Sequence, residues 1–567
     1  MMSKSKIVDN STSIDALELV RKNYKEYSTY VAGGRAYPNL KDSLKSSYRR
    51  ALYGIYENKT SKIIKVAELA AHALPYHPHP SSVSGVIIQM GEAGNKLKMF
   101  DTQGNWGDST RGVEASAERY IGGKLSTLAE HLLLDSVEYA NFVKGEIEKD
   151  EPEALPVLLP LCFINGLTGI PTGLPALNIP TLDINGMIDY YIEILNNKDI
   201  NYVPSKLPLP NLEIDILSSK AEWENILLTG KGSIRLAPRM TIKNNVITIT
   251  ALPTGKNIEH IRKIIDKEII QDKVDVRDET AEKICFVVEK VPKKQCDMQE
   301  IYNRLYNKLQ ASVSYNIAFY DADKIYVPCS FKKVVRSNIQ YLIETHQRRL
   351  ANELIQANSR LTVLMIIEGL KKRNLVKSLF ELDYAGAVAF LVKHFKCTEN
   401  DASKVLQKPI SYLTKEHGKE IEELEAEIEN LKNNQANIYD YLIEKYKAIK
   451  KEIGSVIKGK FEPTVFVSEK VKTRKSKDKS SEEVESKPKK VATKTTKTTK
   501  KTKSSEATKN ATTKDNSKTK SISNDVAKSS KNTKTKVDAK STAKKTIKKD
   551  SNVKETKTSV TKRKLPK

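Results

Sequence analysis

The sequence has few cysteines, no long apolar run and, from about residue 471 onward, no aromatic residue. The five cysteines lie far apart and form no C-x-x-C pair, which argues against a disulfide framework or a zinc site. No stretch of about 18 apolar residues occurs, and the first residues lack the apolar core of a signal peptide. We therefore expect a soluble, cytoplasmic protein with reduced thiols and no membrane partner.

Common catalytic signatures are also missing. Residues 229–233 (TGKGS) lack the spacing of a P-loop, which excludes a P-loop nucleotidase. Asp321 and Asp323 could hold Mg²⁺, but no partner glutamate stands at a suitable spacing, so an exposed loop is the favoured interpretation. His77 and His79 lie in a Pro-rich turn and lack the i, i+4 spacing of a metal-binding helix, so phosphate contact is the better hypothesis for them.

The net charge of +26 is concentrated at one end of the chain. Residues 471–567 contain 32 basic and 10 acidic side chains and thus carry +22, which leaves a nearly balanced body. A segment made largely of Lys, Thr, Ser and Ala buries too little apolar surface to fold, so we expect a disordered tail. Its charge favours salt-dependent contact with DNA or RNA. A solubilising extension, or a nuclear address at residues 562–564, is the alternative.

The first 150 residues show helical spacing followed by a Gly-rich stretch. Apolar positions predict helices over 12–30, 40–57, 61–74 and 81–91, with a polar turn at 75–80 and a hairpin-like segment at 101–108. A helix, a tight turn, a second helix and a hairpin are typical of a winged helix-turn-helix, which is a nucleic-acid-binding fold.

The remainder of the chain changes character twice. Residues 155–260 favour a β-containing domain, and 258–330 mix helices with strands such as 284–288. Beyond Pro328, we expect long helices at 332–374 and 415–453, paired antiparallel, and a compact helical knob at 377–410. The predicted fold class is therefore α+β and multidomain. Its predicted parts are an N-terminal arm (1–30), a winged-helix domain (31–150), an α+β tower (151–330), a coiled-coil arm with its knob (331–455), and a linker with the basic tail (456–567).

Five motifs in order resemble a known family. They are RAYPNLKDSLKSSYRR (35–50), YHPH (76–79), QGNWG (103–107), AERY (117–120) and NGLTGI (165–170), and the shorter pieces TGKG (229–232) and RDE (277–279) extend the likeness to about residue 455. The chain resembles the DNA-cleavage subunit of type IIA DNA topoisomerases, the family that holds the A subunits of DNA gyrase and topoisomerase IV and the medium subunit of phage topoisomerases. It departs from the family at Pro80, where glycine is usual, and at Val86, where an acidic residue is usual.

The resemblance implies roles for named residues. It makes Tyr120 the nucleophile that forms a 5′-phosphotyrosyl link with DNA, and the adjacent Arg119 suits the charge of the phosphorane oxygens. It also implies that Ile170 is a wedge that bends the DNA by entering between base steps. The DNA contacts that it implies are Arg35, Lys45, Arg49, Arg50, His77 and His79. Taken singly, Tyr120 would be an ordinary tyrosine, Ile170 a core residue, and Arg49 and Arg50 part of a solvated helix face.

The resemblance also implies partners. Strand passage requires ATP and Mg²⁺, and we expect both to be held by a separate ATPase/TOPRIM subunit, with no metal site in this chain. The expected assembly is a heterotetramer of two copies of this chain and two partner subunits on double-stranded DNA. The basic tail stands where gyrases carry a DNA-wrapping domain, so relaxation or decatenation is expected rather than supercoiling. The arrangement resembles that of phages, for which host cytoplasm is the expected location. The alternatives are an architectural DNA-binding dimer and another phosphotyrosine-forming enzyme, such as a recombinase or nicking protein.

Overall fold

A computed structural model describes residues 15–457 and 465–467, except 78, 110–111, 148, 269–272, 282 and 322–323. The predicted disordered tail lies outside these residues. Helices and strands are mixed along the described chain, which confirms the predicted α+β class. No described helix is long and apolar enough to cross a membrane.

The four predicted N-terminal helices are present, and the second and third start later than predicted. Helix α1 (Ala16–Val31) begins where the Asp15 carboxylate accepts a hydrogen bond from the amide of Leu17, and it leads into the short π-helical turn η1 (Ala32–Ala36). Helices α2 (Ser46–Glu57), α3 (Val66–Ala73) and α4 (Pro80–Gly91) then pack on one another. The helix predicted over 40–57 starts only at Ser46, because Ser43 adopts a left-handed φ of 59° and the Asp42 carboxylate caps the amide of Leu44 in a turn.

A three-stranded antiparallel sheet stands next to these helices, in the order β1-β3-β2. Its strands are β1 (Ile64–Lys65), β2 (Phe100–Gln103) and β3 (Gly122–Leu125). The hairpin predicted at 101–108 is wrong, because β2 pairs with β3 across a long connection that begins at Gly104 and Gly107, both at positive φ. The AERY segment (117–120) therefore arrives at the end of this sheet, directly before β3.

The middle of the chain forms two further sheets. The larger has the order β17-β8-β9-β14-β7-β6 and shares an apolar core with α7 (Ile184–Asn196) and α8 (Lys220–Thr229). The smaller has the order β10-β11-β13-β12 and packs against α9 (Ile258–Glu268) and α10 (Met298–Lys308) around its own apolar core. The strands are β6 (Leu167–Gly169), β7 (Leu177–Ile179), β8 (Asp215–Ile216), β9 (Lys231–Ala237), β10 (Arg239–Lys243), β11 (Val246–Ala251), β12 (Val274–Asp278), β13 (Phe286–Lys290), β14 (Ala311–Asn316) and β17 (Val465–Phe466).

Shorter elements connect these parts. They are α5 (Thr127–Ala129), η2 (Glu130–Leu134), η3 (Val137–Tyr139), β4 (Phe142–Lys144), β5 (Asp150–Pro152), α6 (Leu161–Ile164) and the hairpin β15 (Ala318–Asp321) with β16 (Lys324–Pro328). One continuous apolar core joins the N-terminal helices, the larger sheet, residues 331–342 at the start of α11 (Phe331–Lys372) and residues 442–453 of α17 (Ile438–Ile457). The two regions that carry the predicted site residues therefore share a single packed body.

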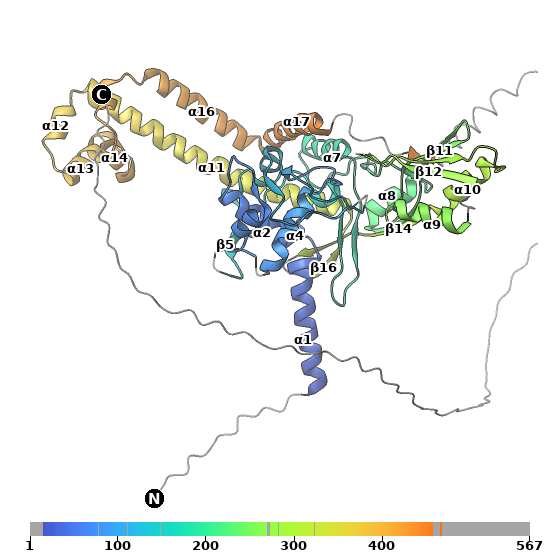
Figure 1. Cartoon of the computed structure of the whole chain (residues 1–567). Coiled ribbons are helices and arrows are strands. Elements are labelled where there is room, and N and C mark those ends of the chain that lie inside the picture. The colour runs from blue at the N-terminus through green and yellow to red at the C-terminus, as the bar shows by residue number, and fades with distance from the viewer. Residues whose placement is uncertain are drawn as a thin grey trace, which may run out of the picture. The chain divides into compact units, whose positions relative to one another are not determined.

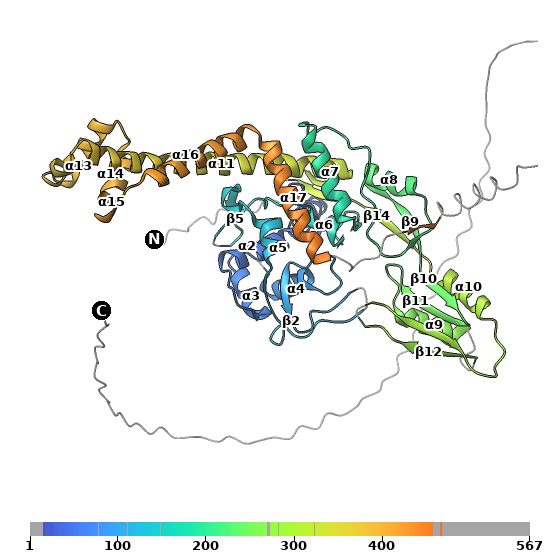
Figure 2. The same cartoon turned by 90° about the horizontal axis from the view of Figure 1, so that it is seen from above.

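The C-terminal helices confirm one long helix and contradict the other. Helix α11 (Phe331–Lys372) is continuous, and the short helices α12 (Val376–Phe380), α13 (Tyr384–Phe395), α14 (Glu399–Leu406) and α15 (Ser411–Thr414) follow it around a small apolar core. The second long helix predicted over 415–453 is wrong, since it breaks at Asn437, with φ −114° and ψ 52°, into α16 (Gly418–Ala436) and α17 (Ile438–Ile457). Figures 1 and 2 show α16 running beside α11, and α17 packs instead on α7.

Candidate functional site

Tyr120 stands on the surface, two residues before β3. Its backbone amide donates to the carbonyl of Ala117 at 2.8 Å, which closes a tight turn ahead of the strand. The side chain is 65% exposed, and the Arg119 guanidinium lies over its ring, 4.7 Å from the centroid. Among the described residues no group hydrogen-bonds the Tyr120 hydroxyl. The phenol is thus open to an incoming ligand and has a fixed positive charge beside it.

Lys65 is a neighbour of Tyr120 that the sequence did not reveal. The pairing of β1 with β3 sets Lys65 opposite Gly122, and its Nζ donates to the backbone carbonyl of Tyr120 at 3.2 Å. The helix predicted over 61–74 begins only at Val66, and an all-helical segment would not place Lys65 on a strand. The β-branched pair at 63–64 was the available signal for that strand. Arg119 therefore lies over the exposed phenol ring, and Lys65 binds the backbone of the same residue.

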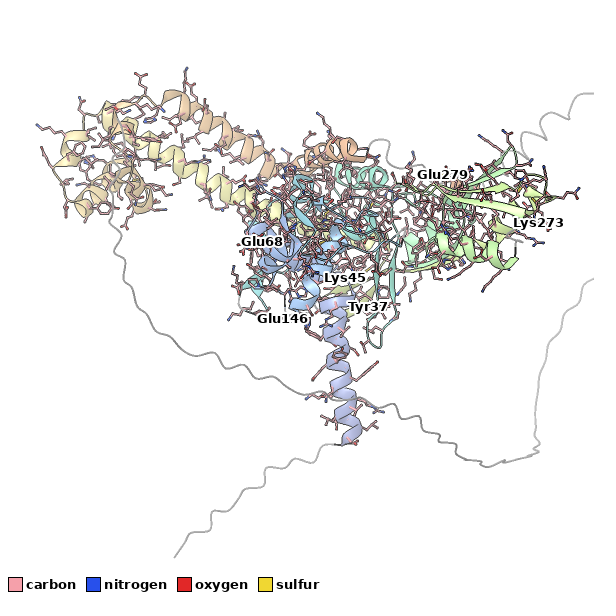
Figure 3. The ribbon with its side chains drawn as sticks, viewed as in Figure 1. Tyr37, Lys45, Glu68, Glu146, Lys273 and Glu279 are labelled. Carbon is pink, nitrogen blue, oxygen red and sulfur yellow. The ribbon has the colours of Figure 1, made fainter. Side chains whose placement is uncertain are left out.

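A second cluster of predicted residues lines a cavity of about 320 Å³, here termed the cationic cavity. It lies where the end of α1, the start of α2, the 76–79 turn and α4 meet. Five predicted DNA contacts line it: Arg35, Lys45, Arg50, His77 and His79. Tyr30, Ser47 and Tyr48 also line it and were not predicted, whereas Arg119 and Tyr120 do not. Figure 3 labels Lys45 near the end of α1 where η1 begins.

Lys45 joins the cavity to the larger sheet. It directly precedes α2, and its Nζ donates to the carbonyl of Thr168 on β6 at 2.8 Å. Burial lowers the pKa of the Lys45 ammonium. The side chain thus connects β6 to the N-terminal helices at the cavity wall.

The two histidines are arranged by the backbone between them. His77 is only 4% exposed, and its Nδ1 accepts a hydrogen bond from the backbone amide of His79 at 3.1 Å. Burial, assisted by the charges of Arg50, His79 and Arg35, lowers the pKa of His77 to about 4, so its ring is neutral near pH 7. The His77 Nε2 is buried and has no hydrogen-bond partner among the described residues.

Arg49 and Arg50 are not placed as the sequence analysis expected. Arg49 is buried and binds Asp42 through two hydrogen bonds, at 2.6 and 3.2 Å, and it does not line the cavity. Arg50 reaches the cavity, but it is also buried, with 2.6 Å from its Nε to Glu151 and 2.9 Å from its Nη2 to Glu146. Neither occupies a solvated helix face. Their charges are matched by carboxylates, so both residues brace α2, and the expectation that they contact the DNA backbone stays a prediction.

Ile170 directly follows β6, at the start of the loop that joins β6 to β7. Its side chain is 89% exposed, so Ile170 is not the core residue that an isolated isoleucine would suggest. A side chain at Gly169 would meet the carbonyl of Ala36 at 2.3 Å, so β6 passes very close to η1. The hairpin therefore holds an apolar side chain in solvent beside the cationic cavity wall.

Metal-binding chemistry is sparse in the described part of the chain. Those residues contain no group of three or more His, Cys, Asp or Glu side chains that could hold a metal ion. Asp321 ends β15, and Asp323 lies outside the described residues. The contacts of Tyr120 with Arg119 and Lys65 are with cations, which do not bind Mg²⁺.

Comparison with known proteins identifies the family of this chain. A family model for the A subunit of DNA gyrase and topoisomerase IV matches residues 35–454, which include every predicted site residue. The chain is 27% identical over 464 residues to the A subunit of DNA gyrase from Leptospira biflexa, covering 76% of this chain and 53% of that protein. It is also 27% identical over 441 residues to the A subunit of DNA topoisomerase 4 from Haemophilus influenzae, covering 74% of this chain and 58% of that protein. The chain thus spans about half the length of these relatives, and it belongs to the family of DNA gyrase and topoisomerase IV A subunits.

Proposed function

We propose that this chain is the DNA-cleavage and religation subunit of an ATP-dependent type II DNA topoisomerase. The observation that carries the proposal is the exposed Tyr120 with the Arg119 guanidinium over its ring, in a chain whose family match spans both residues. In this proposal the N-terminal helices with the β1-β3-β2 sheet are a winged-helix DNA-binding domain. The two larger sheets are the tower, and α11 with α16 is the coiled-coil arm.

The proposed reaction is a reversible exchange of phosphate esters. The Tyr120 oxygen attacks a backbone phosphorus, a phosphotyrosyl bond to the 5′ end forms, and the bond to the 3′ oxygen breaks. The phenol proton leaves to a base or to solvent, and the 3′ oxygen takes up a proton as it departs. Religation reverses each step, so the energy of the ester bond is conserved. A neutral phenol is a weak nucleophile near pH 7, so the reaction needs assistance from a base, a cation or a metal ion.

The cations around Tyr120 stabilise charge that develops on the phosphate. Arg119 presents a planar guanidinium, which suits two phosphate oxygens at once. The Lys65 ammonium holds the Tyr120 carbonyl at 3.2 Å and adds a second positive charge to the same surface. Both act on the pentacoordinate transition state, which carries more charge on its oxygens than the diester.

Other groups are assigned to DNA or to partners in this proposal. Arg35, Lys45, His77 and His79 contact DNA phosphates in the cationic cavity, and Ile170 wedges between base steps. Mg²⁺ and ATP belong to a partner subunit with ATPase and TOPRIM domains, and two copies of each chain form a heterotetramer. Relaxation and decatenation are the expected products rather than supercoiling.

Trapping with SDS tests the proposal. Purified chain is incubated with supercoiled plasmid and Mg²⁺, with and without a candidate ATPase/TOPRIM partner, and wild type is compared with Tyr120→Phe. We expect a covalent protein–DNA adduct that requires the partner and disappears in the variant. Tyr139→Phe, a change at another tyrosine of the same region, is the matched control and should leave the adduct intact. Tight DNA binding with no adduct would instead support an architectural DNA-binding dimer, and cleavage without strand passage would support a recombinase or nicking enzyme.

A further inference from the structure

Tyr30 is tied to the cationic cavity although it lies outside the residues that match the family model. It is in the last turn of α1, and its hydroxyl stands 2.9 Å from Nε2 of His79. The two rings meet edge to face with centroids 6.2 Å apart, so both the hydroxyl and the ring restrain the imidazole. Tyr30 also lines the cavity itself.

The hydrogen bonds in the turn determine where the proton of His77 resides. A neutral imidazole carries one N–H, and the nitrogen that accepts a hydrogen bond must be the unprotonated one. Nδ1 of His77 accepts from the backbone amide of His79, so the proton lies on Nε2. The neutral state itself follows from burial next to Arg50, His79 and Arg35, which disfavours an added positive charge.

The resulting His77 Nε2–H has no acceptor among the described residues. The side chain is 4% exposed and lines the cavity, and its Nε2 is buried without a partner among the described residues. A buried donor without a partner destabilises the protein, and a bound acceptor removes that penalty. Arg35 and Lys45 line the same space, and their charges select an anion as the ligand.

We infer that Tyr30 is a positioning residue: by holding His79, it fixes the turn that directs the Nε2–H of His77 at a phosphate oxygen of the DNA backbone. The inference rests on the proposed function for the identity of the ligand, a DNA phosphodiester. It adds to that function the residue Tyr30, which lies outside the sequence motifs, and the location of the His77 proton on Nε2. Tyr30 acts through His79 and His77 and does not itself take part in bond breaking.

A purely structural role for Tyr30 has a different consequence. If the hydroxyl only secured the end of α1, its loss would lower stability and leave the response to changes at His77 unaltered. If it positions His77, the effects of Tyr30 and His77 on DNA binding are coupled, because both changes disable the same contact.

The test uses the full-length protein and the change Tyr30→Phe, which keeps the ring and removes the hydroxyl. Tyr27→Phe is the matched control, since Tyr27 is an exposed tyrosine on the same helix that does not line the cavity. Binding of a short fluorescent DNA duplex is followed by anisotropy at one fixed salt concentration, because affinity depends on salt. All of these proteins carry Tyr120→Phe, so that cleavage does not disturb the equilibrium.

We expect Tyr30→Phe to weaken duplex binding about three- to tenfold, the effect of one lost hydrogen bond, and Tyr27→Phe to leave binding unchanged. His77→Ala should weaken duplex binding at least as much. The double variant His77→Ala, Tyr30→Phe should bind less than about twofold more weakly than His77→Ala alone, because the two changes disable the same contact. His77→Gln supplies an amide donor that does not depend on a tautomer, and in that background Tyr30→Phe should have little effect. It also serves where the alanine variant fails to fold.

Two results overturn the inference. One is equal binding by Tyr30→Phe and Tyr27→Phe. The other is independent, multiplicative losses for Tyr30→Phe and His77→Ala, which would indicate separate roles. The SDS-trapping experiment distinguishes this failure from failure of the proposed function. A partner-dependent adduct together with uncoupled binding overturns the positioning role alone, whereas coupled binding without any adduct overturns the cleavage function alone.

Discussion

Positively charged residues near the site differ sharply in what surrounds them. Arg49 lies in the core with both hydrogen bonds directed to the fully buried Asp42, whose carboxylate also accepts the backbone amide of Leu155. Arg119 lies in solvent, over the Tyr120 ring. Because a buried charge needs a partner and an exposed charge does not, the same residue type stabilises the fold at one position and is available to a ligand at the other.

The first prediction concerns these two arginines. Arg49→Met removes one partner of a buried ion pair and leaves the Asp42 carboxylate uncompensated, so we expect a loss of stability of about 3–5 kcal/mol. Arg119→Met is the matched control and should change stability by less than about 0.5 kcal/mol, while abolishing or strongly reducing the covalent adduct. Thermal unfolding measures the first effect and SDS trapping the second. Equal stability of the two variants would contradict the structural role of Arg49.

At the scale of elements, the β6–β7 hairpin is held by three different contacts. Lys45 donates to Thr168 on β6, Gly169 passes against the carbonyl of Ala36, and the Tyr37 hydroxyl donates to the carbonyl of Pro175 in the loop at 2.5 Å. These contacts attach the hairpin to the N-terminal helices rather than to the sheet alone. Ile170 is thereby fixed in solvent, where an apolar side chain gains nothing for folding.

The second prediction follows from that exposure. Ile170→Ala removes a side chain that contacts mainly water, so thermal stability should stay within about 0.5 kcal/mol of wild type. DNA bending, measured by energy transfer between the ends of a labelled duplex, should decrease because the wedge is gone. Leu228→Ala, which changes an exposed leucine on α8, is the control and should bend DNA as the wild type does. Unchanged bending by Ile170→Ala would contradict the wedge.

The junction of α11 and α17 with the N-terminal region contains a partly buried cluster of charged side chains. Asp135 binds Arg349 of α11 at 2.7 Å and Lys445 of α17 at 2.5 Å. His346, fully buried on α11, contacts Ser136 and the ring of Tyr441. Burial, and then the nearby charge of Lys445, lower the pKa of His346, and Arg349 acts in the same direction while Asp135 opposes them.

The third prediction is the pH dependence of stability. Because the folded-state pKa of His346 is below that of an unfolded histidine, near 6.5, the unfolded chain binds a proton that the folded chain does not. Stability therefore falls as the pH decreases below about 6.5, by at most about 1.4 kcal/mol per pH unit for this group. The free energy of unfolding, measured at several pH values across this range, should depend less steeply on pH in His346→Phe than in wild type. A steeper or identical slope in the variant would contradict the assignment.

For the whole molecule, most of the net charge lies outside the described residues. Residues 471–567 carry 32 basic and 10 acidic side chains, whereas the described body contains many matched ion pairs. Counterion release from DNA depends on how many phosphates meet unpaired cations. We therefore expect the tail to contribute to DNA affinity and its salt dependence, and the body to carry the proposed cleavage chemistry.

The fourth prediction separates these two contributions. Removal of residues 471–567 should leave the partner-dependent adduct intact but weaken DNA binding. The slope of log affinity against log salt should fall by about 0.9 for each phosphate contact that is lost. Titration of a duplex at several salt concentrations measures the slope. Loss of the adduct on truncation would show that the tail has a structural role.

The sequence alone determined the elements whose signal is local. Helix periodicity located α11 and the short helices after it, Pro80 marked the start of α4, and the order of motifs led to the family that the comparison confirmed. The composition of the tail separated it from the body. These features depend on neighbouring residues and on chain chemistry, so no tertiary contact is needed to recognise them.

Only the tertiary structure decided which charges are free and which strands pair. The pairing of β3 with both β1 and β2 brings Lys65 to Tyr120. Asp42 holds Arg49 in the core, whereas Arg50 binds Glu151 and still lines the cationic cavity. The same is true of the break at Asn437, where α17 packs on α7 instead of continuing along α11. Such contacts join residues far apart in the chain, and burial sets their energies, which a one-dimensional pattern of charge and hydrophobicity does not contain.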